Sequence, residues 1–156
     1  MVNLQVKGLI SQLRISFPAI LIVAMLSGLI QHPPPWDFAP GGGLRSAAEA
    51  EGFLLIPPAE LPEVLALQTR MLLDARTAAA FDQGHLPMAI SMPLREFDEV
   101  YPQYAPILSP DTPLLVYCGN AACDEALQLA RRLREVGHAD VAIFLEGYEG
   151  WRALQP

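Results

Sequence analysis

Residues 114–125, with the sequence LLVYCGNAACDE, decide the fold expected of this chain. The apolar residues that open the stretch predict a short buried strand, and the small residues after Cys118 predict a loop that leads into a helix. Such a loop holds a thiol where backbone N–H groups can converge on it. Because helix N-terminal amides favour negative charge, they favour the thiolate, which is the reactive form of cysteine. Cys118 is therefore the candidate nucleophile, and an inert cysteine buried at a strand end is the alternative.

Other apolar runs in the chain have the length of short buried strands. They lie at residues 53–56, 71–73, 89–92 and 141–145. Helical segments are expected at residues 44–51, 58–67, 78–83 and 94–101, and a closing segment is expected to begin at Trp151. Apolar strands that alternate with helices predict an α/β domain with a mainly parallel central sheet and helices on both faces.

The most regular helical pattern covers residues 124–136, with Gly137 as its stop. Its apolar residues have the spacing of one buried face. They are Leu127, Ala130, Leu133 and Val136. In a parallel sheet flanked by such helices, ligands bind beyond the carboxyl ends of the strands. Asp74, Cys118 and Glu146 each follow an expected strand, so they are expected to share that edge.

The start of the chain has the pattern of a membrane anchor. Residues 17–30 are uncharged and strongly apolar, and Lys7 and Arg14 precede them. With its two preceding residues the run approaches the length that spans a bilayer, and no Ala-x-Ala type cleavage site follows closely. We therefore expect an N-terminal hydrophobic helix within residues 1–31, acting as a signal anchor or transmembrane helix. A cleaved signal peptide and a buried or oligomerising helix are the alternatives. Positive charge before the helix predicts an extracytoplasmic soluble domain, which in a bacterium is periplasmic.

Length and charge bound the remaining possibilities. The 156 residues have room for one domain of ordinary size and a short appendage. Residues 32–43 are rich in Pro and Gly, which predicts a linker before a soluble domain at residues 44–156. The net charge of −7 and the single lysine, Lys7, argue against nucleic acid as a partner, because phosphate binding requires a basic face.

Four sequence blocks carry a resemblance to a known family. They are LLDAR at residues 72–76 with Phe81 after it, GHLPMAI at residues 84–90, VYC at residues 116–118 and EGYEGW at residues 146–151. In this order and spacing they resemble the rhodanese-like sulfurtransferases, over residues 56–154. The resemblance implies that Cys118 takes up a sulfane sulfur as a persulfide and passes it to a thiol or another nucleophile. It implies no cofactor.

The resemblance also implies the other site residues. Asp74 and Arg76 match the Asp-x-Arg of the family and are the expected supporting residues. Arg76 is the candidate cation near the thiolate, and a structural ion pair is the alternative. In the family the turn that contains His85 orders the fold, so we expect a structural role for this residue. The expected active-site loop consists of Gly119, Asn120, Ala121, Ala122, Cys123 and Asp124.

The loop departs from the family in its charge. Where many members have basic or hydroxyl residues, this chain has small residues followed by Asp124 and Glu125. Thiosulfate is a dianion that needs positive charge near the thiol, so a persulfide or polysulfide is the more suitable donor. The related phosphatases have Arg at the position of Asp124, and an acid there would repel phosphate.

The second cysteine leaves an alternative function open. Cys123 lies five residues after Cys118, and the pair can form a disulfide if their Cα atoms come within about 7 Å. Thiol–disulfide redox chemistry is therefore an alternative to sulfur transfer, and a noncatalytic membrane-tethered binding module is a third. We expect no metal site, because the three histidines are far apart in sequence and only two cysteines are present.

Overall fold

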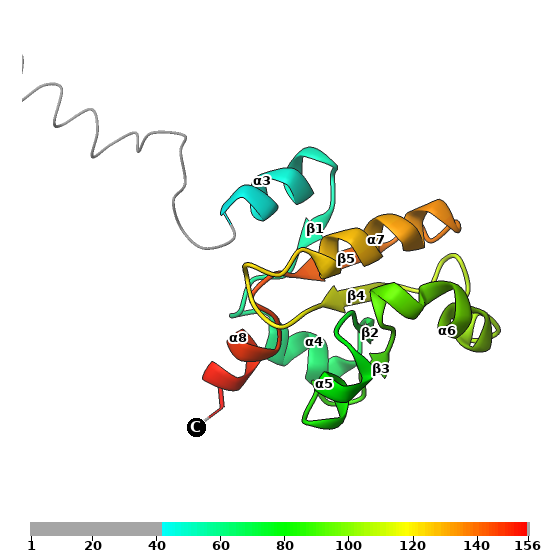
Figure 1. Ribbon diagram of the computed structural model, residues 1–156. Coiled ribbons are helices and arrows are strands. Elements are labelled where there is room, and N and C mark those ends of the chain that lie inside the picture. Colours follow the sequence, from blue (N-terminus) through cyan, green and yellow to red (C-terminus); the bar gives the residue numbers. More distant parts are fainter. Residues whose placement is uncertain (1–41, 156) are drawn as a thin grey trace, which may run out of the picture. The chain divides into compact units, whose positions relative to one another are not determined.

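The computed structural model describes residues 42–155 (Figure 1). The expected anchor within residues 1–31, and all but the end of the expected linker, lie outside the described residues. Between residues 42 and 155, no helix is both long and apolar enough to cross a membrane.

Helices and short strands alternate along the described chain. Their order is α3 (Gly42–Ala50), β1 (Leu54–Leu55), α4 (Leu61–Leu67), β2 (Met71–Asp74), α5 (Ala78–Asp82), β3 (Ile90–Ser91), the 3-10 helix η1 (Leu94–Glu96), α6 (Phe97–Tyr104), β4 (Leu114–Tyr117), α7 (Glu125–Glu135), β5 (Val141–Phe144) and α8 (Gly147–Ala153). The α/β pattern expected from the sequence is confirmed.

The five strands form one sheet in the order β1-β5-β4-β2-β3. Every neighbouring pair is parallel. The register places Asp74 beside Tyr117, and Tyr117 beside Phe144. The carboxyl ends of the three central strands therefore meet at one edge, where the sequence analysis expected the site.

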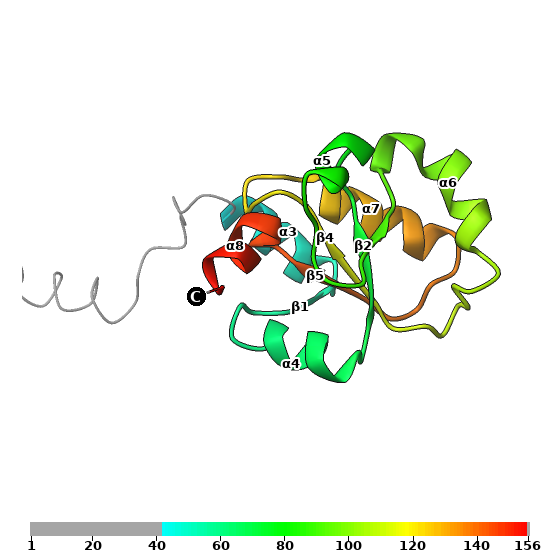
Figure 2. The ribbon, with the colours of Figure 1, turned by 90° about the horizontal axis from the view of Figure 1, so that it is seen from below.

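Both faces of the sheet are covered, as Figures 1 and 2 show. Because side chains alternate along a strand, Leu114 and Val116 of β4 join a core with α7, while Leu115 and Tyr117 join a second core with α4. Cys118 continues the alternation and lies in the α7 core. The expected parallel sheet with helices on both faces is confirmed.

The end of α7 differs from the expectation at Val136. Leu127, Ala130 and Leu133 are buried as expected, but Val136 is 42% exposed. The helix ends at Glu135, and Val136 has non-helical dihedral angles. Gly137 follows with a φ of 104°, a left-handed conformation that favours glycine and does not continue the helix.

The last helix also begins earlier than expected. It starts at Gly147 rather than at Trp151. The first-turn N–H groups of a helix have no partner within the helix, and here those of Tyr148 and Glu149 donate to the carbonyls of Cys118 and Gly119, at 2.8 and 2.9 Å. This partnership between distant segments is why the helix can begin there.

Candidate active site

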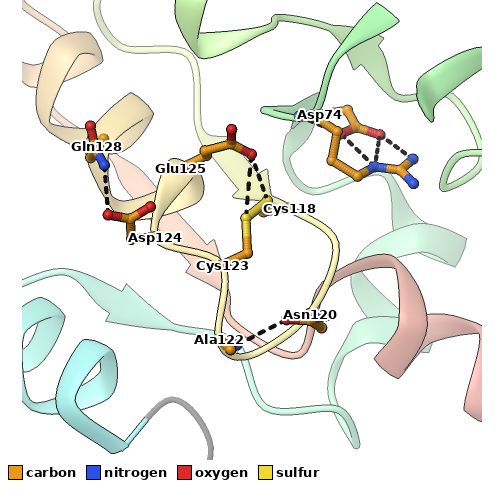
Figure 3. The surroundings of a disulfide bond; sticks show 9 residues. Asp74, Cys118, Asn120, Ala122, Cys123, Asp124, Glu125 and Gln128 are labelled. Atoms are coloured by element: carbon orange, nitrogen blue, oxygen red, sulfur yellow. Dashed lines mark hydrogen bonds and ion pairs between the residues drawn. A yellow bond between two sulfur atoms is a disulfide. The ribbon is translucent and has the colours of Figure 1, made fainter. Parts of the chain in front are cut away.

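Cys118 follows β4 directly at the carboxyl edge of the sheet. It is 2% exposed and packs in the α7 core. Its sulfur is joined to that of Cys123 in a disulfide, and the two Cα atoms are 6.2 Å apart (Figure 3). The loop from 118 to 124 is therefore tight enough for the two cysteines to react with each other.

Asn120 organises the active-site loop. Its side-chain Oδ1 accepts a hydrogen bond from the N–H of Ala122 at 3.1 Å. Its backbone carbonyl accepts one from the N–H of Cys123 at 3.0 Å. The sequence analysis expected loop amides to converge on the sulfur. In this disulfide form these two amides instead donate to Asn120 and stabilise the turn of the loop.

Glu125 faces the two sulfur atoms. Its Oε2 lies 3.3 Å from Sγ of Cys118 and 3.4 Å from Sγ of Cys123. Asp124 turns the other way and accepts a hydrogen bond from Nε2 of Gln128 at 2.7 Å, on the exposed side of α7 (Figure 3). The sequence analysis assigned Asp124 to the active-site loop and did not include Glu125. The pair of adjacent acids in the sequence indicated that a carboxyl group lies near the loop. Only the direction of the side chains decides which of the two contacts the sulfur atoms.

Asp74 and Arg76 form an ion pair beside the loop. Asp74 is fully buried at the end of β2. Arg76 donates from Nη2 to Oδ2 of Asp74 at 2.6 Å and from Nε to Oδ1 at 3.0 Å. Burial alone would lower the pKa of Arg76, but the hydrogen bonds and the charge of Asp74 raise it overall. The guanidinium is therefore a cation neutralised by a buried carboxylate, which matches the structural alternative.

Further contacts hold Arg76 in place. Nη2 also donates to the carbonyl of Gly84 at 2.7 Å. The guanidinium carbon lies 4.3 Å from the ring centre of Tyr148, a cation–π distance.

Tyr117, at the end of β4, remains un-ionised. Burial, together with the negative charge of Asp74, raises the pKa of its hydroxyl. The neutral hydroxyl accepts a hydrogen bond from the N–H of Leu86 at 3.1 Å.

Gly147, the first residue of α8, supports the loop, and the sequence analysis assigned it no role. A Cβ at this position would lie 2.5 Å from the carbonyl oxygen of Cys118. The backbone here has a φ of 62°, which glycine adopts without strain. The EGYEGW block contained this glycine, but its approach to the loop depends on how β5 lies beside β4.

His85 has no contact that would make it a base for Cys118. It is exposed, and its ring stacks on that of Phe81 with centroids 3.8 Å apart. Its Nδ1 lies 3.1 Å from the carbonyl oxygen of Phe81. These contacts stay within one turn, in agreement with the structural role expected for it.

One group among the described residues has the spacing of metal ligands. The sulfur atoms of Cys118 and Cys123 and a carboxylate oxygen of Glu125 all lie within 4.8 Å of one another. In the disulfide neither sulfur is a thiolate, which is the form that binds metal. Reduction of the disulfide is therefore a condition for any metal to use this group.

An apolar cavity of about 350 Å³ lies elsewhere in the domain. Its lining includes Val64 and Leu65 of α4. It also includes Met71, the first residue of β2, and Pro113, which directly precedes β4. Since Cys118 follows the opposite end of β4, this cavity is not the reacting site.

The comparisons with known proteins agree with this geometry. A family model described as the Rhodanese-like domain matches residues 58–154. No curated protein matches the sequence. A thiosulfate sulfurtransferase from Pseudomonas aeruginosa is 30% identical, with a TM-score of 0.54, over 65% of this chain and 19% of that one.

Two other solved structures share the fold over most of their own length. The human single-domain sulfurtransferase TSTD1 is 19% identical, with a TM-score of 0.56, over 67% of this chain and 97% of that one. The BH2092 protein of Bacillus halodurans is 24% identical, with a TM-score of 0.58, over 73% of this chain and 81% of that one. The family model spans more than half of the chain, and we conclude that this chain belongs to the rhodanese-like domain family.

Proposed function

We propose that this protein moves sulfane sulfur through a persulfide on Cys118. Family membership supports a sulfurtransferase role in general. The observation that supports the specific mechanism is the position of Cys118, buried at the carboxyl end of β4 and at the start of a tight loop into α7. The Cys118 thiolate attacks the outer sulfur of a persulfide donor, the bond from that sulfur to the rest of the donor breaks, and the rest leaves as a thiolate; from thiosulfate the leaving group is sulfite. An acceptor thiol later takes the sulfur.

The charges beside the loop favour a persulfide or polysulfide donor. The Glu125 carboxyl lies against both sulfur atoms. The nearby cation, Arg76, is paired with Asp74. Like charges repel strongly where water screens them poorly, so a thiosulfate dianion is penalised. A persulfide carries at most one negative charge on the transferred sulfur, and none when that sulfur is protonated, so it is penalised less.

Mass spectrometry of the full chain tests this function. The reduced protein is exposed to glutathione persulfide or to thiosulfate, digested, and searched for sulfur added to the peptide that contains Cys118. We expect the adduct in the wild type and in Cys123→Ser, and none in Cys118→Ser. An adduct of wild-type yield in Cys118→Ser would sink the assignment.

Thiol–disulfide exchange is the second candidate function, and the disulfide between Cys118 and Cys123 favours it. Here Cys118 would attack a substrate disulfide and Cys123 would resolve the mixed disulfide. Incubation of the reduced chain with oxidised glutathione separates the two functions. Faster reaction with oxidised glutathione than with glutathione persulfide would favour exchange.

We also propose that residues 1–31 anchor the protein in a membrane, with the soluble domain outside the cytoplasm. The support is the uncharged run at residues 17–30 behind Lys7 and Arg14. The full chain should pellet with membranes and resist carbonate extraction. Recovery of the uncleaved chain in the soluble fraction would refute the anchor.

A further inference from the structure

The carboxyl group of Glu125 is in contact with both cysteines. Its Oε2 is 3.3 Å from Cys118 Sγ and 3.4 Å from Cys123 Sγ (Figure 3). A disulfide sulfur carries no hydrogen and cannot donate a hydrogen bond. In the oxidised form a hydrogen bond between Glu125 and a sulfur therefore requires the proton to be on Glu125. After reduction the carboxylate can accept a hydrogen bond from either thiol. In the reduced protein, Oε2 of Glu125 is therefore close enough to exchange a proton with either cysteine.

The position of Glu125 is set by a rigid element. It is the first residue of α7, and the next residues, Ala126 and Leu127, are buried in the core. The unpaired amides at a helix N-terminus stabilise a carboxylate there. Asp124 is hydrogen bonded to Gln128 instead. The fold thus directs one of the two adjacent acids to the sulfur atoms.

A persulfide on Cys118 would lie within reach of the second thiol. Cys123 can attack Sγ of Cys118, because the two cysteines form a disulfide in this structure. The outer sulfur is then the leaving group. An unprotonated persulfide would have to expel S²⁻, a far poorer leaving group than HS⁻. The displacement therefore needs a base for the Cys123 proton and an acid for the outer sulfur, which one carboxyl group can supply in turn.

Building on the sulfurtransferase function proposed above, we propose that Glu125 carries the proton of the Cys123 thiol to the outer sulfur of a Cys118 persulfide, so that the protein releases sulfide. The S–H bond of Cys123 breaks and its sulfur bonds to Sγ of Cys118. The bond from Cys118 Sγ to the outer sulfur breaks, and that electron pair leaves on HS⁻.

The electrons and protons of this step balance. The sulfane sulfur gains two electrons, and the two cysteine thiols together lose two as they become the disulfide. Glu125 returns to its starting protonation state. A low-molecular-weight thiol is the external reductant: two equivalents reduce the disulfide to two cysteine thiols and leave as their own disulfide. The protein is thereby a persulfide reductase whenever no external acceptor takes the sulfur first.

The test is a single turnover of the full chain with glutathione persulfide, after reduction and removal of the reductant. Mass spectrometry follows the Cys118 persulfide and the disulfide, and trapping with monobromobimane follows sulfide. We expect the wild type to load sulfur, release sulfide and end as the disulfide. Cys123→Ser should load sulfur and keep it. Glu125→Gln should load sulfur but release sulfide about 10²-fold more slowly, as is usual when a general acid–base group is removed.

Two further measurements separate proton transfer from a structural role. Added formate should accelerate sulfide release by Glu125→Ala, because it can replace the missing carboxyl, and should leave the wild-type rate unchanged. Glu135→Gln is the matched control: it makes the same charge change at the other end of α7, where Glu135 pairs with Arg132. We expect it to release sulfide at the wild-type rate.

The outcomes distinguish this inference from the function on which it rests. A wild type that never loads sulfur would overturn both. Stable loading without sulfide or disulfide would overturn sulfide release and leave sulfur transfer standing. Three results would each remove the role of Glu125. Glu125→Gln could release sulfide as fast as the wild type, or it could fail to load sulfur. Formate could fail to accelerate sulfide release by Glu125→Ala.

Discussion

Gly147 lies directly against the backbone of Cys118. The N–H of the following residue, Tyr148, donates to the Cys118 carbonyl at 2.8 Å, and a Cβ at 147 would lie 2.5 Å from that oxygen. A real Cβ does not approach a carbonyl oxygen so closely. The first turn of α8 therefore holds the base of the active-site loop through a contact that only glycine permits.

We expect Gly147→Ala to displace the loop and to abolish persulfide loading on Cys118. The left-handed backbone and the forced contact together should lower the free energy of unfolding by roughly 2–4 kcal/mol. Gly52→Ala is the control, because Gly52 also has a positive φ, of 70°, but nothing lies within 4 Å of the added Cβ. It should lose only about 1–2 kcal/mol and keep activity. Urea unfolding and mass spectrometry measure both, and normal loading by Gly147→Ala would contradict the argument.

The buried pair of Asp74 and Arg76 predicts a large loss of stability when one partner is neutralised. Asp74→Asn keeps the shape but leaves the Arg76 side chain, which is 12% exposed, without its counter-charge. The expected cost is about 3–5 kcal/mol. Asp98→Asn is the control: Asp98 pairs with Arg132 while 83% exposed, so its loss should cost no more than about 1 kcal/mol. Similar urea midpoints for the two variants would show that the buried pair is not a structural support.

The orientation of the two acids predicts donor preference. The wild type should have a higher kcat/KM for glutathione persulfide than for thiosulfate. Glu125→Gln should raise the value for thiosulfate by about tenfold, since it removes a charge beside the sulfur. Asp124→Asn should give a smaller gain, because that carboxylate turns toward Gln128. Both gains should shrink as salt screens the charges. A larger gain in Asp124→Asn would mean that the exposed acid governs donor entry.

The burial of His138 predicts that the folded domain loses stability in mild acid. The residue is 3% exposed, and its Nε2 lies 3.0 Å from the hydroxyl of Tyr101. Burial lowers the pKa of His138 below its ordinary value of 6.5. Between the folded-state pKa and pH 6.5 the unfolded chain binds a proton that the folded chain does not. The stability contributed by neutral His138 is therefore complete above pH 6.5 and is lost as the pH falls, by at most about 1.4 kcal/mol per pH unit.

His138→Gln should flatten this pH dependence, because Gln can accept the Tyr101 hydrogen bond without titrating. His85→Gln, at the exposed histidine stacked on Phe81, should keep the wild-type dependence. Urea unfolding at a series of pH values between 5 and 8 provides the comparison. An unchanged pH dependence in His138→Gln would assign the acid sensitivity to another group.

The sequence by itself was sufficient for the order of the elements and for the family. The apolar runs that became β2, β4 and β5 are short and bounded by polar or small residues, so local pattern marks them well. Cys118 could be singled out because its neighbours in the chain form both the strand and the loop. The N-cap of α5 is also local: the side chain of Thr77 accepts from the N–H of Ala80, three residues later. Each of these features depends on residues close together in sequence.

Only the tertiary structure decided how distant segments meet at the site. Val136 fitted the helical period of α7 but lies beyond the helix end. The partnership of Gly147 with Cys118 depends on β5 lying beside β4. Asp124 and Glu125 are equivalent acids in the sequence, but the rotation of α7 against the sheet directs Glu125 to the sulfur atoms and Asp124 to Gln128. The physical reason is that periodicity reports which residues are apolar, whereas the direction of a polar side chain is set by the packing of its element against others far away in the chain.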